Sequence, residues 1–124
     1  MGPAKILIVE DDPIIASLIE LRLITLGYSV SGKAKNETET LGAIATDVPD
    51  LILMDITLEG ETDGITLTKK ILREKNVPVV FLTGHTDDDT IARVKEVGPS
   101  GFIIKPFNDR DLRVSVELAI TRRG

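Results

Sequence analysis

The chain has 124 residues and a mass of 13.5 kDa, the size of one domain with one core. With 42% hydrophobic and 28% charged residues, its composition excludes a disordered chain or a bare coiled coil. It has no cysteine, which excludes disulfides and thiolate metal sites, and its net charge of −5 argues against nucleic acid or anionic membrane as a partner. Since no apolar run approaches the roughly 20 residues of a membrane span and the N-terminus shows no signal-peptide pattern, we expect a soluble cytoplasmic protein.

Five short apolar runs rich in Ile, Leu and Val alternate with longer segments of helical period. Continuous apolar character along a strand indicates burial on both faces, as in a parallel sheet covered by helices. The second run alternates apolar and polar residues and is therefore expected at an edge of the sheet. The five runs are residues 6–9, 28–34, 51–54, 77–82 and 102–104.

The first helical segment has clear signals at both ends. Asp12 is placed to cap it, Pro13 suits the first helical position, and Gly27 suits its termination. The periodicity predicts a core-facing side made of Ile14, Ile15, Leu18 and Leu21.

Three later helical segments start with the spacing of a capping box, in which two side chains three residues apart bond each other's backbone. These pairs are Asn36 with Glu39, Thr86 with Asp89, and Asn108 with Asp111. The segment between Asp63 and Asn76 forms another helix. The predicted core-facing residues are Ile65, Thr68 and Leu72 in that helix and Leu112, Val116 and Ala119 in the last one.

This alternation predicts a (βα)5 chain folded as a doubly wound α/β domain, with a five-stranded parallel sheet and helices on both faces. In such sheets ligands bind outside the carboxyl ends of the strands, near the point where strand order reverses. Polar side chains follow four of the five predicted strands at this edge. They are Glu10, Asp11 and Asp12 after the first, Asp55 after the third, Thr83 after the fourth and Lys105 after the fifth.

These residue types suit phosphoryl chemistry with a divalent cation. Carboxylates held close together need either raised pKa values or a cation, and Mg²⁺ prefers carboxylate, carbonyl and water oxygens. The Thr83 hydroxyl and the Lys105 ammonium are suited to phosphoryl oxygens.

Structural explanations compete with this interpretation at most of these positions. The acids at 10–12 could serve only as a helix cap with extra first-turn acids, and Thr83 as a turn former before Gly84. Lys105 could be a structural ion-pair partner of Asp55. Asp55 itself is harder to explain structurally, because a carboxylate beside other acids at a strand end costs stability unless something compensates.

Four stretches of the chain resemble the signature stretches of response-regulator receiver domains of two-component signalling. They are ILIVEDDP (6–13), LILMDITLEGETDG (51–64), VVFLTG (79–84) and IIKPF (103–107), in the family's order and spacing. The resemblance covers nearly the whole chain and implies one receiver domain over residues 1–124 with the flavodoxin-like strand order 2-1-3-4-5. The third strand is followed by a loop one residue longer than usual, with Glu59 where the family commonly has proline.

The resemblance also implies a role for each polar strand end. Asp55 would accept a phosphoryl group from a sensor histidine kinase or a phosphotransfer protein, and Lys105 and Thr83 would contact its oxygens. Magnesium (Mg²⁺) would be held by Glu10, Asp11, Asp55 and the carbonyl of Thr57. The domain would catalyse its own phosphorylation and slow dephosphorylation without being a conventional enzyme.

The resemblance further implies an output surface, with Phe102 either a core aromatic or the aromatic residue of the switch. The sequence names neither the downstream protein or output module nor the oligomeric state, and a homodimer is compatible with the family.

Three other functions use a similar fold or nucleophile. A pseudo-receiver would dock partners without phosphorylation. A magnesium-dependent aspartyl phosphatase of the haloacid-dehalogenase type would need a second Asp where Thr57 stands. A flavodoxin-like flavin carrier would need a Ser/Thr/Gly-rich phosphate loop in place of the acids at 10–12, which would repel the phosphate.

Overall fold

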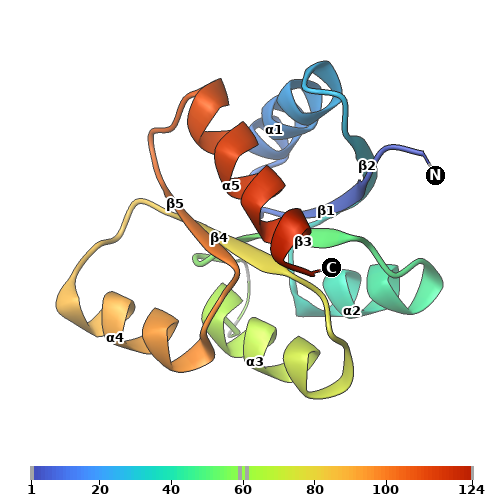
Figure 1. The fold of residues 1–124 in the computed structure, drawn as a ribbon. Helices are drawn as coiled ribbons and strands as arrows, with labels where there is room; N and C mark the ends of the chain where they lie inside the picture. The colour runs from blue at the N-terminus through green and yellow to red at the C-terminus, as the bar shows by residue number, and fades with distance from the viewer. Residues whose placement is uncertain (1, 59, 61, 124) are drawn as a thin grey trace.

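The computed structural model describes residues 2–58, 60 and 62–123. Within these residues, strands and helices alternate along the chain (Figure 1). The strands are β1 (Lys5–Val9), β2 (Ser29–Ala34), β3 (Leu51–Asp55), β4 (Val79–Thr83) and β5 (Gly101–Ile104). The helices are α1 (Pro13–Thr25), α2 (Glu37–Thr46), α3 (Gly64–Glu74), α4 (Asp88–Val97) and α5 (Asp109–Arg123).

The strands form one parallel sheet in the order β2-β1-β3-β4-β5. Helices α1 and α5 cover one face, and α2, α3 and α4 cover the other (Figure 1). This arrangement confirms the doubly wound fold, the predicted strand order and the edge position of β2. Strand order reverses at β1, which has β2 on one side and β3 on the other, so a crevice is expected at the carboxyl ends of β1 and β3.

The core consists of two apolar layers separated by the sheet. Along β1 and β3, alternate residues point to opposite faces, and every residue except Lys5, at the start of β1, is buried. This explains the continuous apolar runs, because a strand covered on both sides has no solvent-facing position. The layer under α1 and α5 contains Ile6, Ile8, Leu51 and Leu53, together with the predicted core residues of α5, Leu112, Val116 and Ala119.

The predicted core-facing side of α1 is wrong. The helix packs Ala16, Ile19 and Leu23 against the sheet. The residues predicted to be buried lie largely in solvent, with exposed fractions of 73% for Ile14, 38% for Ile15, 54% for Leu18 and 61% for Leu21. Both sets satisfy helical spacing, since α1 has more apolar residues than one face needs, so periodicity could not choose between them.

Helix α3 matches its prediction at two of three positions. Ile65 and Thr68 are buried, but Leu72 is 36% exposed, and Ile71 is buried in its place. The buried side of α3 therefore lies slightly round the helix from the predicted one.

Three of the four predicted caps are correct, including that of Asp12 for α1. The side chain of Asn36 accepts the Glu39 N–H, and that of Asn108 accepts the Asp111 N–H. Helix α4 is capped by Asp87 instead of Thr86, with the Asp87 carboxylate accepting the Thr90 N–H at 3.2 Å. A carboxylate is a stronger acceptor than a hydroxyl beside the positive end of a helix.

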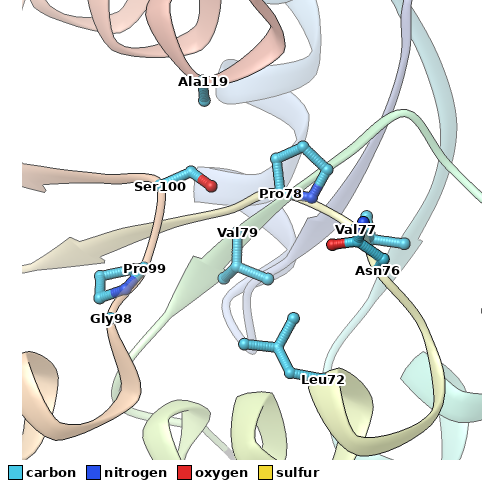
Figure 2. Close-up of a pocket in the computed structure, with 9 residues that line it drawn as sticks. All are labelled: Leu72, Asn76, Val77, Pro78, Val79, Gly98, Pro99, Ser100 and Ala119. Carbon is cyan, nitrogen blue, oxygen red and sulfur yellow. The ribbon is translucent and has the colours of Figure 1, made fainter. Parts of the chain in front are cut away.

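A cavity of about 320 Å³ lies at the edge of the sheet opposite the carboxyl ends of the strands (Figure 2). It is bounded by the end of α3, the start of β4, the turn between α4 and β5, and Ala119 of α5. Its lining has no titratable side chain and none of the predicted site residues. Among the described residues, no helix is long and apolar enough to cross a membrane.

Candidate functional site

The register of the two central strands brings Glu10 and Asp55 to the same place. Parallel pairing matches Ile8 with Leu53 and Val9 with Met54, so Glu10 and Asp55 come next on the two chains. Both acids are nearly inaccessible, with exposed fractions of 3% and 4%. They lie where the fold predicts a binding crevice.

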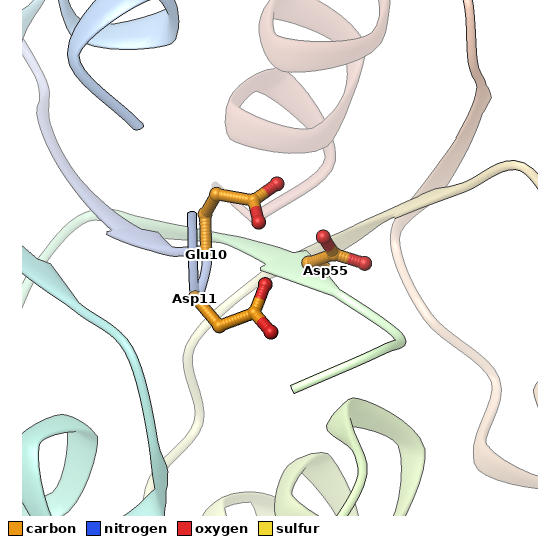
Figure 3. A group of neighbouring side chains, drawn as sticks. All are labelled: Glu10, Asp11 and Asp55. Carbon is orange, nitrogen blue, oxygen red and sulfur yellow. The ribbon is translucent and has the colours of Figure 1, made fainter. Parts of the chain in front are cut away.

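Asp11 completes a group of three carboxylates. Glu10, Asp11 and Asp55 each offer an oxygen within 4.8 Å of the other two, and their side chains converge on one space (Figure 3). Three oxygen ligands at this spacing fit a single hard divalent cation that keeps several waters. The neighbouring Asp12 does not belong to the group, because its carboxylate caps α1 by accepting the N–H groups of Ile14 and Ile15.

Lys105, which directly follows β5, brings a positive charge to this pocket. Its Nζ donates to Asp55 Oδ2 at 2.9 Å and to Glu10 Oε1 at 3.3 Å. Its backbone N–H donates to the Thr83 carbonyl at 2.8 Å, which fixes the start of the loop after β5. The ion pair proposed as the structural explanation for Lys105 therefore exists, and it places the ammonium at the expected site.

Burial and charge shift the pKa values of two groups in this pocket. Burial, reinforced by the nearby Asp55 carboxylate, raises the pKa of Glu10 to about 8. Burial opposes the charge of Lys105, but the hydrogen bond and charge of Asp55, with those of Glu10, outweigh it and raise the pKa of the ammonium. Repulsion among the carboxylates is therefore reduced in two ways: Glu10 holds a proton, and the Lys105 ammonium lies beside Glu10 and Asp55.

Backbone N–H groups orient two of the acids. The Asp12 N–H donates to Glu10 Oε2 at 3.1 Å, and the Thr57 N–H donates to Asp55 Oδ1 at 3.0 Å. The Thr57 side chain is exposed. With Lys105 on Oδ2 and Thr57 on Oδ1, both oxygens of Asp55 have a donor.

Thr83 lies at the correct strand end but bonds within its own loop. Its side chain is buried at 1% exposure, accepts the His85 N–H at 2.9 Å and lies 3.3 Å from the His85 carbonyl, to which it can donate. The structure therefore shows the turn-forming role that competed with the phosphoryl role. Phe102 is partly buried, in the core layer that contains Val94 of α4.

Gly64 is a site residue that the sequence interpretation did not single out. A Cβ at Gly64 would overlap the carbonyl oxygen of Asp55 and lie 3.0 Å from the Cα of Ile56. The Gly64 N–H donates to the Ile56 carbonyl at 2.8 Å. The first residue of α3 thus packs directly on the Asp55 backbone, where only glycine fits. Glu59, at the family's proline position, lies outside the described residues.

Comparison with known families decides what kind of domain this is. The family model described as "Response regulator receiver domain" matches residues 6–117. The chain belongs to this family. The acidic group of Glu10, Asp11 and Asp55 is consistent with a receiver phosphorylation site, and receivers typically bind Mg²⁺ at such a group.

Curated relatives include transcriptional regulators. The chain is 31% identical over 120 residues to the transcriptional regulatory protein PdtaR of Mycobacterium tuberculosis, covering 97% of this chain and 58% of PdtaR. It is 34% identical over 122 residues to the phosphate regulon transcriptional regulatory protein PhoB of Pseudomonas aeruginosa, covering 96% of this chain and 52% of PhoB. The chain thus spans about half the length of these relatives.

Solved structures show the same fold over the full domain. The signal receiver domain of a modulated diguanylate cyclase from Desulfovibrio desulfuricans G20 superimposes with a TM-score of 0.88 at 35% identity, covering 98% of this chain and 97% of that one. A CheY-like receiver domain protein from Methanospirillum hungatei JF-1 has a TM-score of 0.87 at 27% identity, with coverages of 98% and 97%.

Proposed function

We propose that this receiver domain accepts a phosphoryl group on Asp55 from a histidine kinase or phosphotransfer protein, with Mg²⁺, and so switches an output surface. The observation that carries the proposal is the buried Asp55 carboxylate, beside two further acids and one ammonium at the switch point of the sheet. A cytoplasmic location belongs to the same proposal, since it is supported by the receiver family and the expected kinase partner.

In the proposed reaction, a carboxylate oxygen of Asp55 attacks the phosphorus of a phosphohistidine. The new P–O bond replaces the P–N bond, whose electron pair stays on the ring nitrogen, and the imidazole leaves as a neutral ring with the proton already carried by its other nitrogen. Glu10, Asp11, Asp55 and the Thr57 carbonyl would hold Mg²⁺, which when bound neutralises charge on the phosphoryl oxygens. The Lys105 ammonium, already 2.9 Å from Asp55, would neutralise the charge of a second phosphoryl oxygen. The Thr83 hydroxyl would break its hydrogen bond with His85 and donate to a third phosphoryl oxygen.

The acyl phosphate formed on Asp55 is labile, so the same pocket would also catalyse its slow hydrolysis. Turnover of free phosphate esters is not expected. An aspartyl phosphatase of the haloacid-dehalogenase type needs a general acid two residues after the nucleophile, where Thr57 has an exposed hydroxyl side chain in place of a carboxyl group.

Helix α1 offers a surface for the kinase. Ile14, Leu18 and Leu21 form an exposed apolar stripe, and α1 begins at Pro13, separated from the acidic group only by its cap, Asp12. Contiguous apolar side chains on a soluble domain mark contact surfaces. A kinase that docks on this stripe would have its phosphohistidine close to Asp55.

The output surface is proposed on α4, β5 and α5. Ile104 and Val114 are about half exposed there and line a groove between β5 and α5. Inward movement of the Thr83 hydroxyl would leave space below its loop for Phe102, which would couple Asp55 to this face. The downstream partner, a longer output module or a second copy of the chain, would bind the altered surface.

The test is incubation with acetyl phosphate, with and without Mg²⁺, followed by intact mass. The wild type should gain one phosphoryl group only with Mg²⁺, and Asp55→Asn should gain none because the nucleophile is gone. Asp47→Asn makes the same change at an exposed acid paired with Lys5, and should behave as the wild type. A magnesium-dependent adduct on Asp55→Asn would refute the assignment, and absence of any adduct on the wild type would favour a pseudo-receiver.

A further inference from the structure

An ion pair joins α4 to the N-terminus of α3, outside the acidic pocket. Arg93 of α4 approaches Asp63 with two nitrogens, Nη1 at 2.7 Å from Oδ2 and Nη2 at 3.0 Å from Oδ1. Nη2 also lies 3.3 Å from the Thr66 hydroxyl oxygen. Two roughly parallel bonds between a guanidinium and a carboxylate define the orientation of both groups, which a single lysine contact does not.

Asp63 is more than a surface partner for Arg93. Its Oδ1 also accepts the Thr66 N–H at 2.9 Å and so caps α3. Burial alone would raise the pKa of Asp63, but the Arg93 guanidinium and the Thr66 N–H outweigh it and lower the pKa. The carboxylate therefore stays charged and fixed at the first turn of α3.

The residue after Asp63 touches the proposed phosphoacceptor. Gly64 packs on the Asp55 carbonyl so closely that a Cβ would overlap it, and the Gly64 N–H bonds the Ile56 carbonyl at 2.8 Å. The residue after Ile56 is Thr57, whose N–H donates to the Asp55 carboxylate. A continuous series of contacts therefore runs from Arg93 through Asp63 and Gly64 to the Asp55 backbone.

We propose that Arg93 is a positioning residue for the acidic pocket: by clamping Asp63 it holds the α3 N-terminus against residues 55–57 and so sets their affinity for the cation. This inference rests on the proposed function, because it assumes that those residues bind Mg²⁺. It also links the two functional loops, since α4 follows the Thr83 loop and α3 follows the Asp55 loop.

A second ion pair between the same helices supplies a matched control. Lys69 Nζ lies 3.1 Å from Glu96 Oε1, which also joins α3 to α4. Lys69 is more than one helical turn beyond Gly64, away from the contact with Asp55. Lys69→Gln and Arg93→Gln each remove one positive charge and one ion pair between α3 and α4. Only Arg93→Gln frees Asp63, the capping residue of α3, from its contact with α4.

The charge change and the proposed positioning act in opposite directions. Loss of a cation near an acidic pocket strengthens its attraction for Mg²⁺ by long-range electrostatics. Loss of the clamp weakens binding, because residues 55–57 must then be ordered by the ion. A weaker affinity in Arg93→Gln can therefore come only from the lost positioning. Arg93→Lys keeps the charge without the two-pronged contact and should lie between Arg93→Gln and the wild type.

The experiment measures two quantities on each variant by NMR. In the metal-free protein, amide hydrogen exchange at Thr57 and Gly64 should be about three- to fivefold faster in Arg93→Gln, as expected for loss of a partly exposed ion pair. The Mg²⁺ dissociation constant should rise by a similar factor. Lys69→Gln should stay within twofold of the wild type in exchange and should not bind Mg²⁺ more weakly.

Equal behaviour of Arg93→Gln and Lys69→Gln would overturn the inference, and so would faster exchange without weaker Mg²⁺ binding. Failure of the proposed function gives a different result, because the wild type itself would then bind no Mg²⁺. In that case the exchange rates alone decide whether Arg93 holds the Asp55 loop.

Discussion

The middle and the carboxyl end of the two central strands are equally buried but chemically opposite. Ile8 and Leu53 pair across β1 and β3 and are 0% exposed. Two residues later, on the same side of the sheet, Glu10 and Asp55 are almost as buried. Burial of an aliphatic side chain stabilises a fold by about 1.5 to 3 kcal/mol, whereas burial of a carboxylate costs free energy unless charges and hydrogen bonds compensate. The strand middles therefore stabilise the domain, whereas the strand ends hold the acidic group of the proposed site at a cost in stability.

The largest expected effect contrasts these two positions on β3. Leu53→Ala should lower the free energy of unfolding by about 2 to 5 kcal/mol, because it leaves a cavity in a fully packed layer. Asp55→Asn should leave the free energy of unfolding unchanged or higher, since it relieves repulsion within the acidic group while Lys105 keeps Glu10 as a partner. Urea denaturation of the metal-free proteins measures both. A loss in Asp55→Asn as large as that in Leu53→Ala would contradict the comparison.

A second effect is the pH dependence of stability that Glu10 contributes. Its pKa rises from an ordinary value of 4.5 to about 8 on folding. Between these values the folded state holds a proton that the unfolded state has lost, so stability falls as pH rises. The stabilisation is fully present below pH 4.5 and is lost as pH passes through about 8.

Glu10→Gln tests this effect because the amide cannot titrate. In metal-free protein, the free energy of unfolding of the wild type should fall relative to Glu10→Gln between about pH 5 and 8, with an upper limit of ~1.4 kcal/mol per pH unit for one proton. Denaturation curves at several pH values measure the difference. Parallel pH profiles for the two proteins would show that Glu10 is already ionised in the fold.

The sequence was a good guide to the helices only where polar residues restricted the choice. In α3, polar and charged residues limit the choice: Ile65 and Thr68 are correctly predicted to be buried, and the error at Leu72 is a shift by one residue to Ile71. In α1, apolar residues occur around most of the helix, and the side with Ile14 and Leu18 was wrongly assigned to the core. Periodicity identifies a buried side only where apolar residues lie on one side of a helix and polar residues on the other, and α1 shows little of this separation. Its excess apolar residues instead form the stripe proposed for the kinase.

The candidate site was predictable where it follows from strand ends. Glu10, Asp11, Asp55 and Lys105 meet because parallel strands bring their carboxyl ends to one edge. The role of Arg93 could not be predicted in this way, because its contact with Asp63 depends on how α3 and α4 pack across 30 residues of sequence. The Asp-Gly pair at the start of α3 was the one local signal for Gly64.

The smallest of these effects concerns which acids at the strand end bind the cation. Asp11→Ala should weaken Mg²⁺ binding by tenfold or more, at least ~1.4 kcal/mol, since a carboxylate ligand is lost. Glu10→Ala should weaken it less, because the longer Glu10 side chain is expected to act through water and already carries a proton near neutral pH. Asp12→Ala is the matched control: it removes the adjacent acid, which caps α1, and should cost about 1 kcal/mol of stability without a comparable loss of affinity. NMR titration with Mg²⁺ measures all three. Equal affinity in Asp11→Ala, Asp12→Ala and the wild type would mean that the acids after β1 serve only the helix, and that the contrast between strand middle and strand end does not extend to metal binding.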